Sequence, residues 1–321
     1  MEVNAAMTKL RNVGLVGVGA MGEPMGGRLL SAGFRLHTCV HHRRERVMRL
    51  VAQGAVEVED AAAVAARSEV VVTVVPDAPQ VEDVLFGERG VAAGLTADGV
   101  VIDMSTISPV ASRAIAERLK PLGIRMLDAP VSGGPSRAQS GDLTIMVGGE
   151  RETFDRCLPL FEAMGTATLV GPAGMGETFK LANQIIIANV MLANVEALVF
   201  AKKSGADIQQ LRDVLLTATG ANYLLEKWIP TAWFDNAHKV GFAIDLLRKD
   251  LAAAIDAARQ MGIPMMSSAL AYQLYTAASG ERHGTEDYSV VAQLYERAAG
   301  VCVVDGASSA GTADIGAHAK A

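Results

Sequence analysis

A lysine and two amides share one face of a segment whose other residues are mainly apolar. Lys180, Asn183 and Gln184 stand at positions i, i+3 and i+4, so a helix would bring their side chains together. A lysine with a lowered pKa can give a proton to a reacting oxygen or take one from it. Lys180 could instead only extend its charged end to water from near the start of the helix. The residues by themselves leave both interpretations open.

The segment that must position these side chains is predicted to be one long helix within residues 174–205. Its apolar residues cover every side of the helix, which is typical of an element in the interior of a protein. Polar residues interrupt the run and would be costly in lipid, so we predict no membrane partner. These residues are Asn183, Gln184, Asn189, Asn194 and Glu196.

A glycine-rich turn near the N-terminus is the second candidate site. A β-rich run starts at Asn12 and leads into Gly17-Val-Gly19-Ala20-Met21-Gly22, which is followed by apolar residues at helical spacing and a second strand over residues 34–40. In this context the spacing indicates dinucleotide binding, because Gly17 permits a tight turn and Gly19 lets the backbone approach a pyrophosphate. Gly22 would allow the helix to pack closely on the strand. A glycine-rich turn of another α/β fold is the alternative.

The end of the second predicted strand bears on the choice of coenzyme. An acidic residue there would bind the ribose hydroxyl of NAD, but the chain reads Val40-His41-His42-Arg43-Arg44. Arginines can pair with the 2′-phosphate of NADP, so we favour NADP with NAD possible, and we take His42 and Arg43 as cofactor-binding candidates. A solvated helix start would explain the same residues.

Four further runs predict the rest of a sheet, at residues 70–75, 100–104, 126–128 and 143–147. Ligands bind at the carboxyl ends of the strands in such sheets, which singles out the segments that follow three of these strands. These segments are Pro76-Asp77-Ala78-Pro79, Ser105-Thr106 and Ser132-Gly133-Gly134, of which the last could present backbone N–H groups to a carboxylate or form a plain turn. Alternating strands and helices predict an α/β fold with a Rossmann-type, doubly wound, mostly parallel sheet. The later segments read as helical, so we expect an all-α domain joined to the sheet by the long helix.

Composition narrows the function classes. The chain has 321 residues, a net charge of −6, six histidines and three widely spaced cysteines. These features disfavour a nucleic-acid partner, a disulfide framework and a metal site, and we expect no metal. Without a recognisable secretory signal, a cytoplasmic location is expected. We expect an N-terminal extension at residues 1–11, a dinucleotide-binding domain at 12–173, a helical domain at 174–302 and a flexible tail at 303–321.

Five motifs in order resemble the β-hydroxyacid dehydrogenase family, which includes 3-hydroxyisobutyrate dehydrogenase and 6-phosphogluconate dehydrogenase. They cover nearly the whole chain from residue 12 to about residue 297. The motifs are Gly17-Val-Gly-Ala-Met-Gly-Glu-Pro-Met25, Asp103-Met-Ser-Thr-Ile-Ser-Pro109, Asp128-Ala-Pro-Val-Ser-Gly-Gly134 with the run 141–149, Gly174-Met-Gly-Glu-Thr-Phe-Lys180-Leu-Ala-Asn183, and Lys249-Asp250-Leu251.

The resemblance implies a role for each matching position. Lys180 matches the catalytic lysine, and Ser132, Gly133 and Gly134 match the loop that holds the substrate carboxylate. The implied cofactor contacts are Val75, Pro76, Thr106 and Lys249. Asn183 and Gln184 fall on the paired asparagines of the family. Gln184 departs from that pair by one methylene, a version similar to the tartronate semialdehyde reductase branch.

The resemblance implies an NAD(P)-dependent enzyme that transfers hydride between a nicotinamide and a small carboxylate-bearing 3-hydroxy acid or its semialdehyde. It also implies a homodimer or homotetramer. Three alternatives stay open: an imine reductase on the same fold, a non-catalytic NADP-binding or interaction module, and a relative that acts on sulfonated or phosphorylated substrates. For the aromatic segment 223–234, we favour helix packing over an aromatic wall above the substrate or at a subunit contact.

Overall fold

The computed structural model describes residues 10–235 and 241–304, and these form two compact units. The first unit holds the chain up to Ile185 together with Lys249–Met266, and the second holds Ile186–Arg248 and the chain from Ser267 onward. The expected domains at 12–173 and 174–302 stay a prediction. The expected extension and tail lie outside the described residues, apart from positions 10–11 and 303–304.

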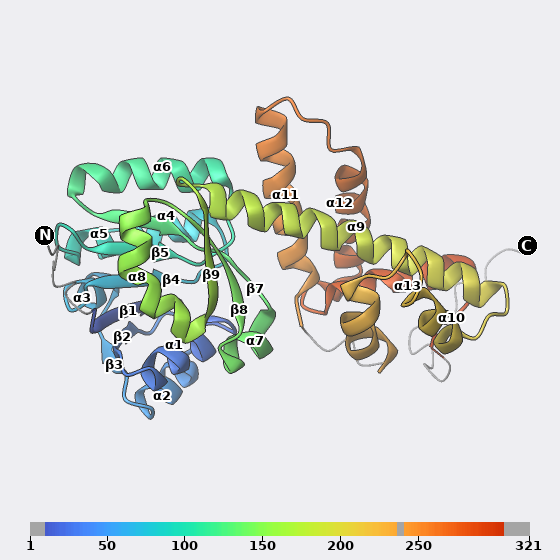
Figure 1. The fold of residues 1–321 in the computed structure, drawn as a ribbon, viewed down its shortest axis with the longest axis horizontal. Helices are drawn as coiled ribbons and strands as arrows, with labels where there is room; N and C mark the ends of the chain where they lie inside the picture. The colour runs from blue at the N-terminus through green and yellow to red at the C-terminus, as the bar shows by residue number, and fades with distance from the viewer. Residues whose placement is uncertain (1–9, 236–240, 305–321) are drawn as a thin grey trace, which may run out of the picture. The chain divides into compact units, whose positions relative to one another are not determined.

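The first unit is built on one nine-stranded sheet (Figure 1). Its strands are β1 (Asn12–Val16), β2 (Arg35–Cys39), β3 (Val56–Val58), β4 (Val70–Thr73), β5 (Val100–Asp103), β6 (Arg125–Asp128), β7 (Val131–Ser132), β8 (Leu143–Gly148) and β9 (Gly165–Gly171). They follow the order β3-β2-β1-β4-β5-β6-β8-β7, with β9 paired to β8. All pairs from β3 to β6 are parallel, which gives the strand order of a Rossmann fold. The predicted doubly wound, mostly parallel sheet is confirmed.

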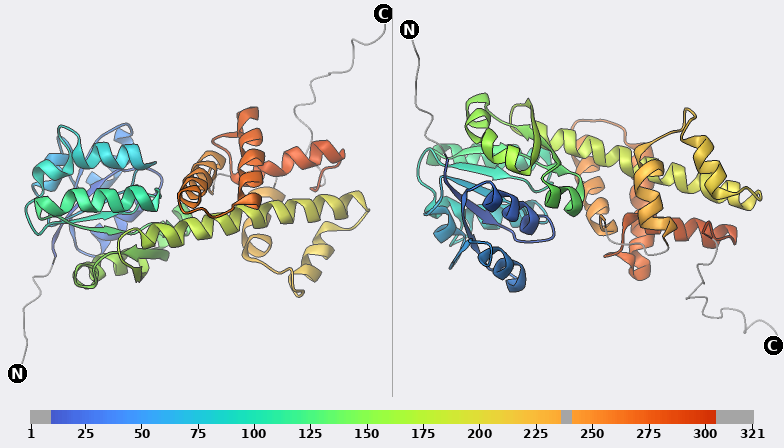
Figure 2. Two further views of the ribbon diagram at one scale, coloured as in Figure 1. Left: turned by 90° about the horizontal axis from the view of Figure 1, so that it is seen from above. Right: turned by 60° about the horizontal axis from the view of Figure 1, so that its bottom comes forward.

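Helices cover both faces of this sheet (Figure 1, Figure 2). They are α1 (Gly22–Ser31), α2 (Arg44–Val51), α3 (Ala61–Ala65), α4 (Ala78–Phe86), α5 (Val91–Gly94), α6 (Pro109–Leu119), α7 (Gly134–Ser140) and α8 (Arg151–Met164). Successive side chains of a strand point to opposite faces, so Val70 and Val72 join the core under α1, α2, α7 and α8, while Val71 joins the core under α3 to α6. Burial on both faces explains why the central strands are continuous apolar runs.

Beyond β6, the sheet is no longer purely parallel. Strands β6 and β7 run antiparallel along one side of β8, with Asp128 opposite Gly148 and Ser132 opposite Thr144. The sequence did not predict β3, β7 or β9. The first two are only three and two residues long, which is too short for a recognisable pattern.

The second unit consists mainly of helices, which confirms the expected helical C-terminal part (Figure 2). After α9 (Met175–Lys203), the chain forms α10 (Ile208–Leu215), α11 (Ile244–Gln260), α12 (Met266–Ala278) and α13 (Ala292–Ala299). In the aromatic segment, Trp233 is buried and Trp228 donates from Nε1 to the buried Asp287 at 3.1 Å. The tryptophans therefore pack inside this unit, as we favoured.

Helix α9 is less buried than its apolar pattern predicted. Ile186 is 61% exposed and Phe200 is 75% exposed. In the described part of the chain, α9 is the one helix long and apolar enough to cross a membrane, and half of its most apolar stretch is buried within the protein. Length and composition of this kind are also found in core helices of soluble proteins, so they are weak evidence for a membrane span.

Candidate active site

The glycine loop between β1 and α1 has the shape that a pyrophosphate needs. Gly17 has a φ of 102°, and a Cβ on it would lie 2.1 Å from the Val74 carbonyl oxygen. A Cβ on Gly22 would lie 2.1 Å from the Gly17 carbonyl oxygen. By contrast, a Cβ on Gly19 would meet nothing within 4 Å. The loop is therefore closed against the sheet and open above Gly19, which fits a dinucleotide.

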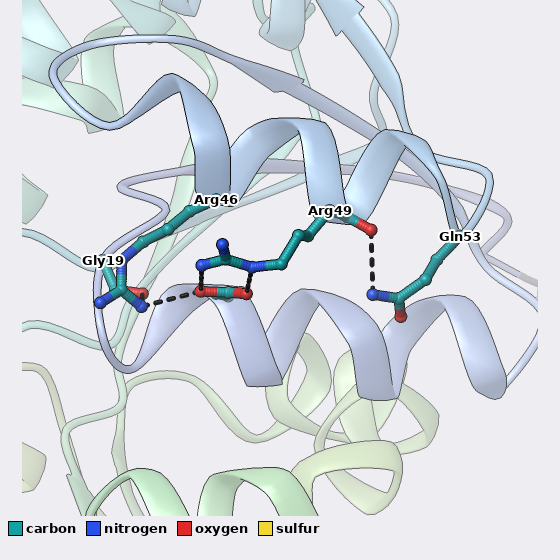
Figure 3. Close-up of polar contacts among 5 residues, drawn as sticks. Gly19, Arg46, Arg49 and Gln53 are labelled. Carbon is teal, nitrogen blue, oxygen red and sulfur yellow. Dashed lines mark hydrogen bonds and ion pairs between the residues drawn. The ribbon is translucent and has the colours of Figure 1, made fainter.

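Ion pairs connect the start of α1, directly after this loop, to α2 (Figure 3). Glu23, in the first turn of α1, accepts from Arg46 at 2.7 Å and from Arg49 through both carboxylate oxygens, at 2.5 and 2.9 Å. Arg46 also donates to the Gly19 carbonyl oxygen at 3.4 Å. Hydrogen bonds and charge from Arg49 and Arg46 lower the pKa of Glu23. These two arginines are thus engaged within the protein.

The turn between β2 and α2 contains the residues expected to read the adenosine end of the coenzyme. His42 and Arg43 are exposed, and α2 begins at Arg44. Arg44 pairs with Glu57 at 3.0 Å. Of the two arginines in this turn, Arg43 is therefore the better candidate for a ligand phosphate.

The other expected cofactor residues follow neighbouring strands. Val16, Thr73, Asp103 and Asp128 stand abreast in the register of β1, β4, β5 and β6. The segments that follow these residues therefore leave the same edge of the sheet, among them Val75-Pro76, Thr106 and the loop before β7. The Val75 N–H donates to Ser105 Oγ at 3.0 Å, which joins two of these segments.

The expected carboxylate loop ends β7 and begins α7. Ser132 is the last residue of β7, and Gly133 and Gly134 have φ values of 135° and 67°. A Cβ on Gly133 would lie 2.8 Å from Arg137 Cβ, so this close packing requires a glycine. Arg137 is itself paired with Asp142 at 3.2 Å.

Glycines and a buried carboxylate fix the start of α9. Asp128 accepts from the Gly174 N–H at 2.7 Å and from the Glu177 N–H at 3.1 Å. A Cβ on Gly176 would lie 2.4 Å from the Met146 carbonyl oxygen, and one on Gly148 would lie 2.6 Å from Asp128 Oδ1. The helix that contains Lys180 therefore starts directly against the carboxyl end of β6.

Three carboxyl groups are buried beneath this helix start. Asp103 accepts from Thr73 Oγ1 at 2.8 Å, and Glu177 accepts from the Ile107 N–H at 3.2 Å. Burial raises the pKa of Asp103, Asp128 and Glu177, most strongly for Glu177, whose pKa is raised further by the charges of the two aspartates. In the residues that the structure describes, Asp103 Oδ2 and Glu177 Oε1 are buried without a hydrogen bond.

Lys180 is 7% exposed, so its ammonium group has lost most of its contact with water. Burial lowers its pKa. Nearby Lys249 also lowers it, while Asp250 and Glu177 raise it. A lysine with a lowered pKa can exchange a proton with a substrate oxygen. The interpretation that Lys180 only extends to water does not fit this burial.

A hydrogen-bonded chain links α9 to α11. Gln184 Nε2 donates to Asp250 Oδ2 at 2.7 Å, and Asn183 Nδ2 donates to Gln184 Oε1 at 3.0 Å. Lys249 forms an ion pair with Asp250 at 3.0 Å and donates to the Thr106 carbonyl oxygen. The structure thus joins Asn183, Gln184, Lys249 and Thr106.

Gln184, expected to bind substrate, is only 1% exposed, and both ends of its amide are engaged. Sequence reasoning gave no role to Asp128, Glu177 or Asp250. All three stand in the motifs that resemble the family: Asp128 ends a strand, Glu177 precedes Lys180 by three residues, and Asp250 follows Lys249. Among residues 10–235 and 241–304, no group of three or more His, Cys, Asp or Glu side chains could hold a metal ion.

Two family models match consecutive parts of the chain. The NAD binding domain of 6-phosphogluconate dehydrogenase matches residues 12–176. The NAD-binding model of NADP-dependent 3-hydroxyisobutyrate dehydrogenase matches residues 174–295. Together they span the sheet, α9 and most of the helical part.

Individual relatives also match this chain over nearly the whole of their own length. The chain is 38% identical to the 2-hydroxy-3-oxopropionate reductase of Escherichia coli, over 88% of this chain and 97% of the relative. A solved 3-hydroxyisobutyrate dehydrogenase of Mycobacterium tuberculosis with L-serine has a TM-score of 0.82 and 31% identity, over 89% and 99% of the two chains. An imine reductase of Myxococcus stipitatus, covering 88% of this chain and 99% of its own, has a TM-score of 0.61 but 15% identity, so it shares the fold alone.

Proposed function

Because the chain belongs to the β-hydroxyacid dehydrogenase family of NAD(P)-dependent enzymes, we propose that it reduces 2-hydroxy-3-oxopropionate (tartronate semialdehyde) with NADPH, using Lys180 as general acid. The observation that carries this proposal is the burial of Lys180 beside the Lys249–Asp250 pair, which contacts Thr106 after β5. In the oxidative direction the same site would serve a 3-hydroxy acid such as 3-hydroxyisobutyrate.

The residues at the sheet edge would hold the coenzyme. Residues 17–22 would contact the pyrophosphate through backbone N–H groups, and Val75, Pro76, Thr106 and Lys249 would lie along the nicotinamide half. The bound nicotinamide supplies the hydride. The exposed Arg43 and the lack of an acid between Val40 and Arg44 support NADPH as the preferred coenzyme.

Lys180 and the loop after β7 would act on the substrate. The backbone of Ser132, Gly133 and Gly134 would bind the carboxylate, helped by the amide of Asn183. As negative charge develops on the aldehyde oxygen, the Lys180 ammonium gives it a proton from Nζ. In oxidation, neutral Lys180 takes the hydroxyl proton. Burial lowers the pKa of Lys180, which favours release of this proton to the substrate oxygen.

The alternatives have less support. The imine reductase match, at 15% identity, shows the fold alone. A phosphorylated or sulfonated substrate would favour several free cationic side chains. The arginine next to the carboxylate loop, Arg137, is already paired with Asp142.

The test compares Lys180→Met with Lys227→Ala, a control at an exposed lysine of the second unit. We expect Lys180→Met to lower kcat for 2-hydroxy-3-oxopropionate by about 100-fold or more while the Kd for NADPH changes little, because proton transfer by a side chain contributes about 10²–10⁴-fold. NADPH oxidation by the Lys180→Met enzyme at the wild-type rate would refute the role of Lys180. No turnover by the wild-type protein, with NADPH still bound, would refute the substrate.

We also propose that the protein forms a homodimer or homotetramer in the cytoplasm. Ile186, Phe200 and Leu270 are large apolar side chains that are each more than 60% exposed, as expected for a contact between copies. The three cysteines are free, which suits a reducing compartment. A monomeric mass in light scattering would refute the oligomer.

A further inference from the structure

The charge of Asp250 sets the direction of the hydrogen-bonded chain that ends at Asn183. Asp250 is 2% exposed, lies beside Lys249 and accepts from Gln184. An ionised carboxylate can accept hydrogen bonds but cannot donate one. Gln184 must therefore turn its NH₂ group toward Asp250 and its carbonyl oxygen toward Asn183.

Asn183 must then donate to Gln184, and this determines which hydrogen-bonding groups of the Asn183 amide remain available to a ligand. One of its two N–H bonds is used at 3.0 Å. Its carbonyl oxygen Oδ1 and its second N–H make no hydrogen bond in the part of the chain that the structure describes. Asn183 is only partly buried and stands three residues after Lys180, on the same side of α9. It therefore offers one donor and one acceptor next to the candidate proton donor.

We propose that Gln184 is a positioning residue rather than a substrate ligand, and that the Asn183 amide it holds selects substrates with a hydroxyl group next to the reacting carbonyl. This inference rests on the proposed function of the site. The second N–H of Asn183 suits an oxygen of the substrate carboxylate, and Oδ1 suits the neighbouring hydroxyl as a donor. A substrate with hydrogen or methyl at that carbon would leave Oδ1 unpaired.

Gln184 is suited to this role because it reaches two partners at once. Its carbonyl oxygen and its NH₂ group contact residues on different helices, α9 and α11. Asparagine would be one methylene shorter at this position. The second partner, Asp250, also lies close enough to raise the pKa of Lys180. Replacing Asp250 therefore changes the electrostatic environment of Lys180, whereas replacing the neutral Gln184 does not.

The test measures kcat/KM with NADPH for two aldehydes that differ only at the carbon next to the carbonyl. One is 2-hydroxy-3-oxopropionate and the other is 3-oxopropionate, which has hydrogen in place of the hydroxyl. We expect the wild-type protein to prefer the hydroxylated aldehyde by about 10- to 100-fold, because losing a hydrogen bond at a partly buried acceptor has an effect of this order.

Gln184→Met keeps the length of the side chain but can hold neither Asn183 nor Asp250. We expect this variant to lose most of the hydroxyl preference, mainly through a higher KM for 2-hydroxy-3-oxopropionate. The kcat/KM for 3-oxopropionate should fall less, because that aldehyde loses only the contact between Asn183 and the carboxylate. The matched control is Gln209→Met, which breaks a glutamine–aspartate hydrogen bond of 2.9 Å on exposed α10 and should leave the preference unchanged.

Asp250→Asn is the second variant and keeps the size of the side chain. An asparagine can donate as well as accept, so the direction of the chain is no longer fixed and the hydroxyl preference should again fall. This variant also removes a negative charge from the surroundings of Lys180, which are Glu177 on α9, Asp250 and Lys249 on α11, and Asp103 and Asp128 beyond Glu177. Without Asp250 the pKa of Lys180 should fall further, so reduction should weaken at a lower pH than in the wild type.

Four outcomes overturn the inference. A hydroxyl preference that survives in Gln184→Met and Asp250→Asn would show that the chain does not orient Asn183. An equal loss for both aldehydes would make Gln184 a ligand of their shared carboxylate or a purely structural residue. A wild-type enzyme that reduces both aldehydes equally well would refute the inference but leave the family reaction standing, whereas a wild-type protein that reduces neither would refute the proposed function as well.

Discussion

Replacing Glu177 by glutamine tests whether the buried carboxyl group behind Lys180 is neutral. The unfolded chain loses this proton near pH 4.5, whereas burial and the charges of Asp103 and Asp128 raise the pKa well above that value in the folded protein. Between the two pKa values the folded state binds one more proton than the unfolded state, so stability falls as pH rises. The loss is about 1.4 kcal/mol for each pH unit in this window.

Glutamine is neutral at every pH and still offers a carbonyl oxygen to the Ile107 N–H, which Glu177 binds at 3.2 Å. We therefore expect Glu177→Gln to gain stability relative to wild type by about 1.4 kcal/mol per pH unit above pH 4.5, until Glu177 ionises in the folded protein. From that pH upward the difference should stay constant.

Urea unfolding at pH 5, 6, 7 and 8 measures this difference. Far-UV circular dichroism is the suitable signal, because Trp228 and Trp233 both lie in the second unit and would not report on the sheet. Glu162→Gln, at an exposed glutamate of α8, is the matched control. A stability difference that does not change from pH 5 to pH 8 would refute the argument that burial keeps Glu177 protonated.

Three further substitutions test the loop, the helix start and the coenzyme site. Gly22→Ala places a Cβ 2.1 Å from the Gly17 carbonyl oxygen, so we expect the Kd for NADPH to rise at least about 10-fold in a fluorescence titration; unchanged binding would contradict the tight packing. Asp128→Ala leaves the N–H groups of Gly174 and Glu177 unpaired, so we expect a loss of about 2–6 kcal/mol in urea unfolding, and a loss below about 1 kcal/mol would contradict it. Arg43→Ser should lower kcat/KM for NADPH about 10-fold and leave NADH within about twofold, and an unchanged ratio would remove Arg43 from the phosphate site.

Much of the fold follows from local patterns in the sequence. The run at residues 70–75 predicts a strand buried on both faces, and β4 (Val70–Thr73) is fully buried. Strand β7 could not be predicted, because its two residues are defined by their partners on β8 rather than by any pattern of their own. Helix α9 shows a limit of another kind, since an apolar pattern on every side predicted burial, yet Ile186 and Phe200 are exposed.

The candidate site was predictable where spacing along one element decides it. The face of Lys180, Asn183 and Gln184 follows from helical periodicity, and the glycine loop follows from its position between a strand and a helix. The partner of Gln184 did not follow, because Asp250 is 66 positions away and only the fold brings the two together. The buried group of Asp103, Asp128 and Glu177 was missed for the same reason.

Two separate stretches of the chain form the first unit, so the parts of the candidate site are synthesised at different times. The strands, the glycine loop and Lys180 all come from the chain before Ile186, but Lys249 and Asp250 return to that unit only after residues 186–248. A growing chain could therefore complete its coenzyme-binding sheet while the partners of Thr106 and Gln184 are still to be synthesised. For the same reason, no fragment ending at Ile185 would contain the whole candidate site, although it would hold Lys180 and all strands of the nine-stranded sheet.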